Sequence, residues 1–462
     1  MIIFIVKKLI NLFIDLIYIN IMYKPIIFRI PNTDNSFLNK DSTNIKISTS
    51  INQPLLSLGF HSFLHRTKNG MSITKTLETK NKFYYIVNPF EHEINDFKDD
   101  INNKVDTYFK DNKVKIISRA FYKLWEILIY FDVASKKDLK YAGIAEAPGS
   151  FVQAVLKFRE KFNLDIKNNN LYTISIHPEN GNYLTMSKQF LGHYNEKYNN
   201  IINNHKTYTF KSSNKYKSRD NGDITQLKSV SLFKSDVLKK GKYMDLITAD
   251  GGFNWEDENF QEQEAYSLIL GEILAAIQIQ EKGGHFILKI FETFTLVTIK
   301  LIYLLSSYYD ECYLYKPFFS RSSNSEKYLI CKNFKYDNNS KEIKTSVSIL
   351  ETMLKNMDTK LFVNDIFSDL KLPIEFLNMF KYININIANN QQVIINKMIT
   401  YIKGNNYFGE EYHTYRENQI NANEWWSKNF FIEKYDEKIN TVKEYSDFND
   451  SEIKLFVNNL QL

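Results

Sequence analysis

The sequence contains few of the residues that define disulfide-rich, collagen-like or linker-like proteins. Only 2 cysteines, 8 prolines and 15 glycines occur among its 462 residues. Cys312 and Cys331 are too few for a disulfide framework or a cysteine-rich zinc site. We expect both to be small buried apolar residues in a reducing compartment. The low glycine and proline contents exclude collagen-like, glycine/serine-linker and proline-rich architectures.

Charge and hydropathy indicate a folded protein of mild basic character. Lysine and arginine number 59 against 53 acidic residues, a formal net charge of +6, which suits a polyanionic partner without requiring one. A hydrophobic content of 44% with 24% charged residues excludes wholesale disorder. The length allows about three domains of roughly 150 residues, or one large domain with extensions.

The first 21 residues are mostly apolar and close to membrane-spanning length. Lys7, Lys8 and Asp15 interrupt this run, and the absence of a small-residue cleavage site disfavours a signal peptide. Three interpretations stay open: an amphipathic or signal-anchor helix, a helix docked on the protein, or a start-codon artefact with true initiation at Met22. We expect no membrane association in the rest of the chain.

The most regular pattern covers residues 113–336. Apolar segments predict strands at 141–145, 171–176, 244–249, 285–291, 311–316 and 327–334. Intervening patterns predict helices at 119–131, 262–280 and 295–308, the first capped by Ser118 and the second stopped by Gly283-Gly284. Apolar strands that alternate with helices predict a parallel sheet covered on both faces, in a doubly wound α/β domain.

The flanking regions have weaker patterns. Residues 22–112 predict an irregular α+β region that packs on the sheet domain, and residues 340–462 predict a mostly helical domain. In the latter, a core role for Trp425-Trp426 is favoured over stacking on a base. Residues 194–222 are polar and basic, and interrupt the strand–helix alternation. They are interpreted either as a solvated insertion or as the flank of a nucleic-acid groove.

The turn Glu146-Ala147-Pro148-Gly149-Ser150 follows the first predicted strand of the sheet. In doubly wound folds this turn is the usual nucleotide contact, and its glycine permits close backbone approach. The sequence has no GxGxxG fingerprint here and no phosphate-binding GxxxxGK[ST] loop anywhere. Dinucleotide and ATP binding therefore lose support.

Lys289 stands in an otherwise apolar predicted strand, where a buried cation is costly. Lys289 must therefore reach solvent at the strand end, pair with an acid, or lose its charge. Burial and a neighbouring cation would lower its pKa, which is how a lysine becomes a base. Asp250 closes the preceding strand and is expected to face the same cleft. Taken singly, Lys123 and Glu326 resemble surface charges, and Asp223 a turn aspartate.

Together these residues resemble those of the FtsJ/RrmJ-type ribose 2'-O-methyltransferases. The resemblance rests on SRAFYKLWEIL around Lys123, TADGGF around Asp250, GGHFILKIF around Lys289 and SRSSNSEKYLI around Glu326. It covers about residues 115–335. NGDIT and KPFFSRSSNSEKYLICKNF are similar to the branch that methylates mRNA caps in eukaryotes and large DNA viruses.

The resemblance implies a Rossmann-like methyltransferase sheet and S-adenosylmethionine as the cofactor, with no metal. It implies a catalytic tetrad in which Asp250 and Lys123 orient Lys289, while Glu326 holds Lys123 or the ribose. The implied cofactor contacts are Glu146, Ala147, Pro148, Gly149, Ser150 and Phe151, with Asp223 at the adenine end. The implied substrate contacts are Ser320, Arg321 and Asn324.

Two positions depart from the family pattern. Gly143 stands where the first strand usually ends in an acidic residue, and Glu146 is expected to take over the methionine end of the cofactor. His177 lies near the place of the acid that usually holds the cofactor's ribose, which leaves that contact open. A catalytic role for His177 is disfavoured.

Three functions stay open on the sequence alone. They are a 2'-O-methyltransferase acting on the first transcribed nucleotide of capped mRNA, the same chemistry on ribosomal or transfer RNA, and a non-catalytic RNA-binding scaffold on the same fold. A capping-machinery partner is a further expectation. The Asn/Ile/Lys-rich composition suggests an AT-rich genome, either that of a large DNA virus acting in host cytoplasm or that of a protist.

Overall fold

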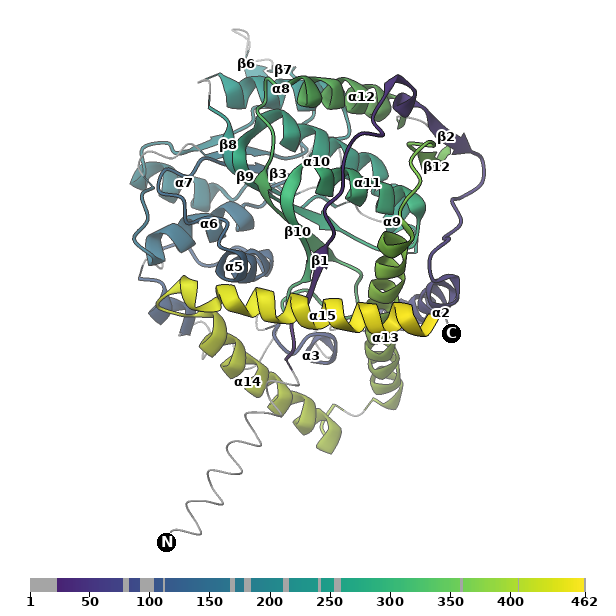
Figure 1. Ribbon diagram of the computed structural model, residues 1–462. Helices are drawn as coiled ribbons and strands as arrows, with labels where there is room; N and C mark the ends of the chain where they lie inside the picture. The colour runs from purple at the N-terminus through teal and green to yellow at the C-terminus, as the bar shows by residue number, and fades with distance from the viewer. Residues whose placement is uncertain are drawn as a thin grey trace.

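The structure is a computed structural model of the chain (Figure 1). It describes residues 23–77, 83–91, 104–110, 113–166, 171–177, 184–210, 216–239, 242–252, 259–357, 360–405 and 407–460. The apolar segment predicted at 1–21 lies outside the described residues.

An eight-stranded sheet forms the centre of the protein. Its spatial order is β1 (Ile26–Ile30), β10 (Tyr309–Lys316), β11 (Lys327–Phe334), β9 (Gln280–Ile290), β8 (Met244–Ala249), β3 (Tyr141–Ile144), β4 (Leu171–Ile174) and β5 (Ile202–Asn204). The strands from β9 to β5 are parallel, which confirms the Rossmann-like prediction. Beyond β9 the pairings are antiparallel, so the all-parallel expectation is wrong at this edge. No helix separates β10 from β11, and such directly connected strands pair antiparallel.

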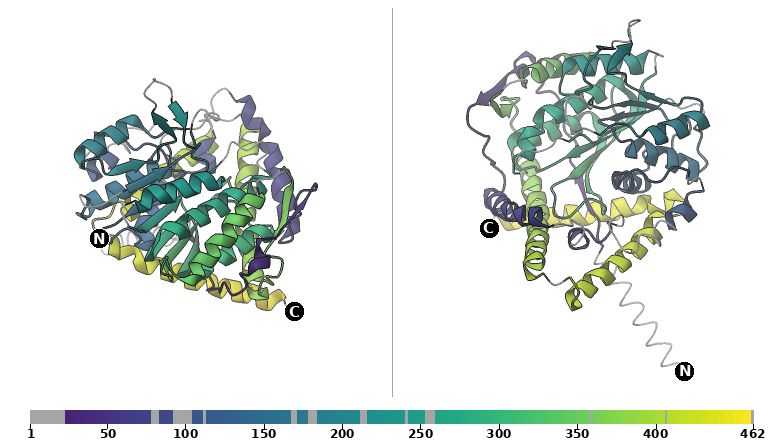
Figure 2. Two further views of the ribbon diagram at one scale, coloured as in Figure 1. Left: turned by 90° about the horizontal axis from the view of Figure 1, so that it is seen from above. Right: turned by 180° about the vertical axis from the view of Figure 1, so that it is seen from behind.

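Helices cover both faces of the sheet (Figure 2). One face packs against α5 (Ala120–Phe131), α6 (Ser150–Lys161) and α7 (Lys188–Lys197). The other packs against α8 (Leu227–Leu238), α10 (Tyr266–Ile279), α11 (Leu296–Ser307) and α12 (Lys341–Met357). Every residue of β3 and β8 is buried, as expected for central parallel strands. The sheet therefore separates two apolar cores.

The helix predicted at residues 262–280 ends before the two glycines, Gly283 and Gly284, that were expected to stop it. Helix α10 ends at Ile279, and Gly283-Gly284 lie inside β9, so the prediction that they stop the helix is wrong. Gly283 has φ +76°, a conformation that glycine adopts without strain. The β8–β9 register also shifts between Met244 and Leu246. The glycines therefore permit an irregular start to β9.

Residues 194–222 contribute a strand that the sequence did not reveal. Strand β5 is the outermost parallel strand, so the solvated-insertion interpretation is wrong for this part. Strands β6 (Tyr208–Phe210) and β7 (Tyr216–Ser218) form a separate ribbon. His205, just after β5, lies 2.7 Å from Asp236 and 3.1 Å from Asp220. The contact with Asp236 ties the segment to α8.

The regions before and after the sheet domain pack on it and on each other. Strand β1 completes the sheet edge, and β2 (Ile45–Ser48) pairs with β12 (Phe362–Ile366). A third apolar core joins α2 (Leu58–Asn69), α3 (Tyr84–Val87) and α13 (Ile374–Gly404). The short elements are η1 (Lys40–Thr43), η2 (Gly70–Thr76), α9 (Gln261–Glu264) and η5 (Tyr435–Lys438).

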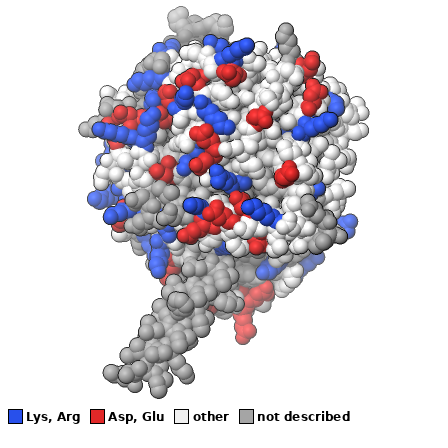
Figure 3. Space-filling view, viewed as in Figure 1, with Lys and Arg blue, Asp and Glu red and all other residues white. Residues whose placement is uncertain are grey.

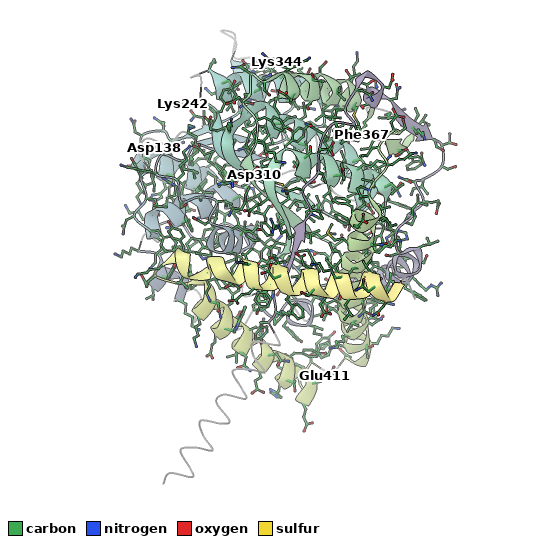
Figure 4. The ribbon with its side chains drawn as sticks, in the orientation of Figure 1. Asp138, Lys242, Asp310, Lys344, Phe367 and Glu411 are labelled. Carbon is green, nitrogen blue, oxygen red and sulfur yellow. The ribbon has the colours of Figure 1, made fainter. Side chains whose placement is uncertain are left out.

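The C-terminal region is mostly helical, as predicted. It ends in α14 (Glu410–Phe430) and α15 (Ile439–Leu460), and α15 crosses β1 (Figure 1). Glu411 at the start of α14 extends outward, whereas Phe367 after β12 lies among core side chains (Figure 4). Trp426 is fully buried and donates to Glu126 Oε1 at 2.9 Å, so its predicted core role is confirmed.

The two cysteines have the predicted environment. Cys312 and Cys331 are buried free thiols that face each other across the β10–β11 pairing. Among the helices described, none combines the length and apolar character needed to cross a membrane.

Candidate functional site

Two of the predicted catalytic residues lie at the carboxyl ends of adjacent parallel strands. Asp250 directly follows β8, and Lys289 is the second-last residue of β9. Lys289 Nζ lies 3.1 Å from Asp250 Oδ1 and donates to the Asp250 main-chain oxygen at 3.0 Å. Tyr328, opposite Lys289 on β11, donates to Asp250 Oδ1 at 2.9 Å. The Asp250 carboxylate is therefore held from two strands.

The other predicted pair joins the first turn of α5 to the start of β11. Lys123 Nζ lies 2.6 Å from Glu326 Oε1, and the two side chains are only 7% and 12% exposed. Interpreting either residue as a surface charge is wrong, because helix packing buries this ion pair. Glu326 also acts electrostatically on Lys289. The structure thus brings the predicted tetrad into one cluster.

Of the three outcomes expected for Lys289, the structure shows pairing with an acid. Burial lowers the pKa of Lys289, but Asp250 and Glu326 raise it by more, and the pKa lies above its ordinary value. The alternative of a lowered pKa is wrong, because carboxylates dominate the surroundings of the ammonium. Lys289 is therefore protonated at neutral pH, able to donate hydrogen bonds and to stabilise negative charge.

Glu326 is held in its ionised form. Burial raises the pKa of Glu326, but Lys123 and Lys289 outweigh that effect and hold the pKa well below its usual range. A carboxylate between two ammonium groups can accept hydrogen bonds from either lysine or from a hydroxyl.

Glu272 is a buried member of this neighbourhood that the sequence analysis missed. Its Oε1 accepts a hydrogen bond from Gly251 N at 3.1 Å. Burial raises the pKa of Glu272 to about 8, although Lys289 opposes that shift. Glu272 is the only charged residue in the apolar helix α10. A single charged residue in an otherwise apolar segment, the pattern that singled out Lys289, could therefore have identified Glu272 from the sequence.

The turn after β3 is built around Glu146. Its carboxylate accepts from Val152 N at 2.8 Å and from Tyr141 Oη at 2.9 Å, and burial raises the pKa of Glu146 to about 8. A Cβ on Gly143 would collide with Glu146 Oε2. The absence of a side chain at Gly143 therefore leaves room for the carboxyl group of Glu146. Glu146 faces inward and holds the turn, and its predicted cofactor contact stays a prediction.

The other predicted turn residues also make internal contacts. Pro148 accepts a main-chain hydrogen bond from Ser187 at 3.0 Å, and Ser150 Oγ lies 2.8 Å from Ser118 Oγ. Gly149 has φ +110°, a left-handed conformation that favours glycine. Phe151 is buried beneath the turn. These contacts fix the backbone that leads into α6.

A pocket of about 130 Å³, open to solvent, lies at the carboxyl ends of β3, β4 and β8. Its walls are Ala145, Ala147, Ser175, Ile176, Leu184, Gly222, Asp223, Ile224, Asp250, Gly251, Gly252 and Leu268. Its position suits a nucleotide-like ligand of a doubly wound fold. Asp250 belongs to both the pocket and the charged cluster, and a Cβ on Gly252 would lie 3.6 Å from Lys289 Nζ. The pocket therefore adjoins the tetrad.

Asp223 and Ala147 are the predicted cofactor contacts that line this pocket. Asp223 Oδ1 accepts from the main chain and hydroxyl of Thr225, at 2.9 and 2.8 Å. His177 lies in a neighbouring cavity rather than among the walls of this one. Apolar walls with a few polar groups suit an adenosine, so the residues present fit the implied cofactor.

The predicted substrate contacts hold the loop before β11. Ser320 is 3% exposed, and Lys316 Nζ donates to the main-chain oxygens of Asn324 and Glu326 at 2.9 and 2.8 Å. Arg321 Nε donates to Glu91 at 2.9 Å, and its guanidinium lies over the ring of Tyr84. These contacts orient the loop beside Glu326. Direct binding of substrate stays a prediction.

A second charged cluster lies near the end of β9. His61, His65 and Glu292 carry metal-ligand atoms within 4.8 Å of one another. Lys68 Nζ lies 2.5 Å from Glu292 Oε1, and His65 Nε2 lies 2.9 Å from Glu292 Oε2. The Lys68 ammonium thus neutralises the Glu292 carboxylate. We therefore assign a structural role to this cluster.

Charges of both signs are interspersed on the face seen in Figure 3. On this face the lysine and arginine side chains therefore do not gather into a continuous positively charged patch. An RNA-binding groove stays a prediction.

The central part of this chain is similar to known methyltransferases. Residues 116–334 match the model of the FtsJ-like methyltransferase family. The cap-specific mRNA (nucleoside-2'-O-)-methyltransferase 1 of Homo sapiens is 36% identical over 162 residues, 34% of this chain and 18% of the relative. That of Dictyostelium discoideum is 42% identical over 118 residues, 25% of this chain and 16% of the relative. That of Danio rerio is 41% identical over 117 residues, 25% of this chain and 14% of the relative.

The aligned part of the chain thus spans less than a fifth of the length of these curated relatives. The family match includes Lys123, Asp250, Lys289 and Glu326. Residues 116–334 of this chain therefore form a methyltransferase domain of the FtsJ-like family.

Proposed function

We propose that the protein transfers a methyl group from S-adenosylmethionine to the ribose 2'-hydroxyl of the first transcribed nucleotide of capped mRNA. The observation that carries this proposal is the largely buried Lys123–Glu326 and Asp250–Lys289 cluster beside a pocket at the carboxyl ends of the parallel strands. The substrate class is supported by the names of the relatives, which are cap-specific mRNA methyltransferases.

The pocket walls would hold the cofactor, whose sulfonium methyl group is the electrophile. Ile176, Ile224 and Leu184 offer apolar surface for a base, while Asp223 offers a carboxylate. The glycines at 251 and 252 bring main chain, rather than side chain, to the border between pocket and tetrad. Close alignment of nucleophile and methyl group can supply much of the rate acceleration.

Lys289 acts on the acceptor oxygen as an ammonium. A ribose hydroxyl ionises only at high pH, so negative charge that develops on its oxygen must be stabilised. Lys289 Nζ keeps a donor for this oxygen while Asp250 holds the ammonium in place. Lys123 and Glu326 then fix the opposite side of the acceptor site. The proton released from the hydroxyl passes to solvent.

The test uses labelled S-adenosylmethionine and matched short RNAs. One set is capped and the other uncapped, and each is also prepared with its first 2'-hydroxyl already methylated. Lys289→Ala is compared with Lys282→Ala, which removes a lysine from the exposed start of the same strand. We expect transfer only to capped RNA with a free 2'-hydroxyl, with loss in Lys289→Ala and retention in Lys282→Ala.

Other outcomes would redirect the assignment. Transfer to uncapped structured RNA would support a ribosomal or transfer RNA substrate. Cofactor binding without transfer to any RNA would support the scaffold hypothesis. A capping-machinery partner, a viral origin and a cytoplasmic location stay predictions from the sequence.

A further inference from the structure

Glu272 is a carboxylic acid in an almost wholly apolar setting. It lies in the middle of α10, is 1% exposed, and is surrounded along the helix by buried aliphatic residues. A buried carboxyl is costly unless it is hydrogen-bonded or faces a cation. Glu272 has both kinds of partner, and both belong to the catalytic neighbourhood.

The first partner is the backbone of the turn after β8. Gly251 N donates to Glu272 Oε1 at 3.1 Å. A Cβ on Gly251 would lie 2.4 Å from that oxygen and 3.0 Å from two carbons of Leu268. The glycine therefore lets α10 approach the turn, and the Glu272 carboxyl supports it from inside the protein. Gly251 lies between Asp250 and Gly252, and all three line the pocket.

The second partner is the charge of Lys289. Glu272 is one of three acidic residues that raise the pKa of Lys289, together with Asp250 and Glu326. In return, Lys289 favours the ionised form of Glu272, whereas burial and Asp250 oppose it. The groups that face Glu272 from β8 and β9 are thus Asp250 and Lys289, and Glu326 acts on the same ammonium from the start of β11.

We propose that Glu272 is a positioning residue of the catalytic centre, which fixes the turn formed by Asp250, Gly251 and Gly252 and thereby the Asp250 main-chain oxygen to which the Lys289 ammonium donates. This inference rests on the proposed function for its effect on turnover. Its effect on cofactor binding is independent of the RNA substrate. Glu272 touches neither the pocket nor an acceptor site, so it acts through its two partners.

Two substitutions separate the roles of Glu272. Glu272→Gln keeps an oxygen acceptor for Gly251 N and removes the charge, whereas Glu272→Ala removes both. Gln278→Ala is the matched control, because Gln278 is another buried polar residue of α10 whose partner, Glu351, lies on α12. The measurements are the Kd of S-adenosylhomocysteine, the melting temperature, and the pH profile of methyl transfer.

We expect Glu272→Ala to bind S-adenosylhomocysteine about tenfold more weakly, because a buried N–H loses its acceptor. Glu272→Gln should restore binding to within about threefold of the wild type, and Gln278→Ala should bind normally. Since the pKa of Glu272 lies at about 8, the wild-type profile should contain an inflection near pH 8 that Glu272→Gln lacks. The KM for RNA should change less than that for the cofactor.

Normal cofactor binding by folded Glu272→Ala would overturn the role in positioning the turn. A pH profile of Glu272→Gln that superimposes on the wild-type profile would overturn the role in holding Lys289. If the wild type methylates no RNA, the proposed function fails separately. The binding measurements, repeated from pH 6 to 9.5, then still decide both roles of Glu272.

Discussion

The buried ion pair between Lys123 and Glu326 gives the sharpest test of the site. Its atoms lie 2.6 Å apart, and neither side chain is more than 12% exposed. Lys123→Met preserves much of the volume of the side chain but removes the ammonium. The Glu326 carboxylate is then left with Lys289 and Lys316 as its nearby cations. We expect a loss of both stability and methyl transfer.

The size of the stability loss follows from burial. Removing one partner from a buried ion pair costs about 3–5 kcal/mol. Because Lys289 still compensates part of the Glu326 charge, we expect about 3 kcal/mol for Lys123→Met. At about 2–4 °C per kcal/mol for a domain of this size, the melting temperature should fall by about 6–12 °C. The double variant Lys123→Met/Glu326→Gln should recover about 2 kcal/mol, because it leaves no unpaired charge.

The pH dependence provides an independent check. The folded-state pKa of Glu326 lies below its unfolded value, so its contribution to stability is present above about pH 4.3 and is lost as the pH falls. Lys123→Met raises that folded-state pKa, and its deficit should therefore shrink in acid. Thermal unfolding of the four proteins of the double-mutant cycle, at pH 4 and 7.5, measures both effects. Additive single-variant losses, with a deficit independent of pH, would refute the reasoning.

Further predictions concern the pocket and the helical core. Gly222→Ala should abolish cofactor binding without unfolding the protein, because φ is +70° and the new Cβ would clash with the Ser175 carbonyl; calorimetric titration with S-adenosylhomocysteine checks this. Burial raises the pKa of Glu126 to about 7, so its contribution to stability is lost as the pH rises through that value. Glu126→Gln should consequently be less stable than the wild type at pH 5, by a margin that narrows at pH 8.5 in thermal unfolding. Trp426→Phe should cost about 1–3 kcal/mol in denaturant unfolding, because the Glu126 carboxylate loses a buried donor.

Local sequence was enough to predict the central strands and to single out Asp250 and Lys289 at their ends. Strands β3 and β8, and the second half of β9, are largely buried on both faces, and such segments appear in a sequence as nearly continuous apolar runs. Asp250 and Lys289 were predictable for the same reason, since polar residues at the ends of those runs must share one edge of the sheet. The resemblance then connected them with Lys123 and Glu326, whose flanks show no burial pattern of their own.

Other features depend on residues that are distant in the chain and were not predictable from local pattern. Strand β5 is too short and polar to show an apolar run, and β1 becomes an edge strand only by pairing with β10. Gly143 has a physical explanation only once the Glu146 carboxyl occupies the space beside it.

The charge state of the centre was likewise decided by tertiary structure. The sequence shows a lysine in an apolar strand, which must reach solvent, pair with an acid or lose its charge. The fold surrounds that lysine with Asp250, Glu326 and Glu272, and its pKa rises. The sequence by itself therefore determined the central parallel strands and singled out Asp250 and Lys289 on them, because both follow from local burial patterns. Their protonation was decided only by the fold, because it depends on the distances between charges that separate strands and helices bring together.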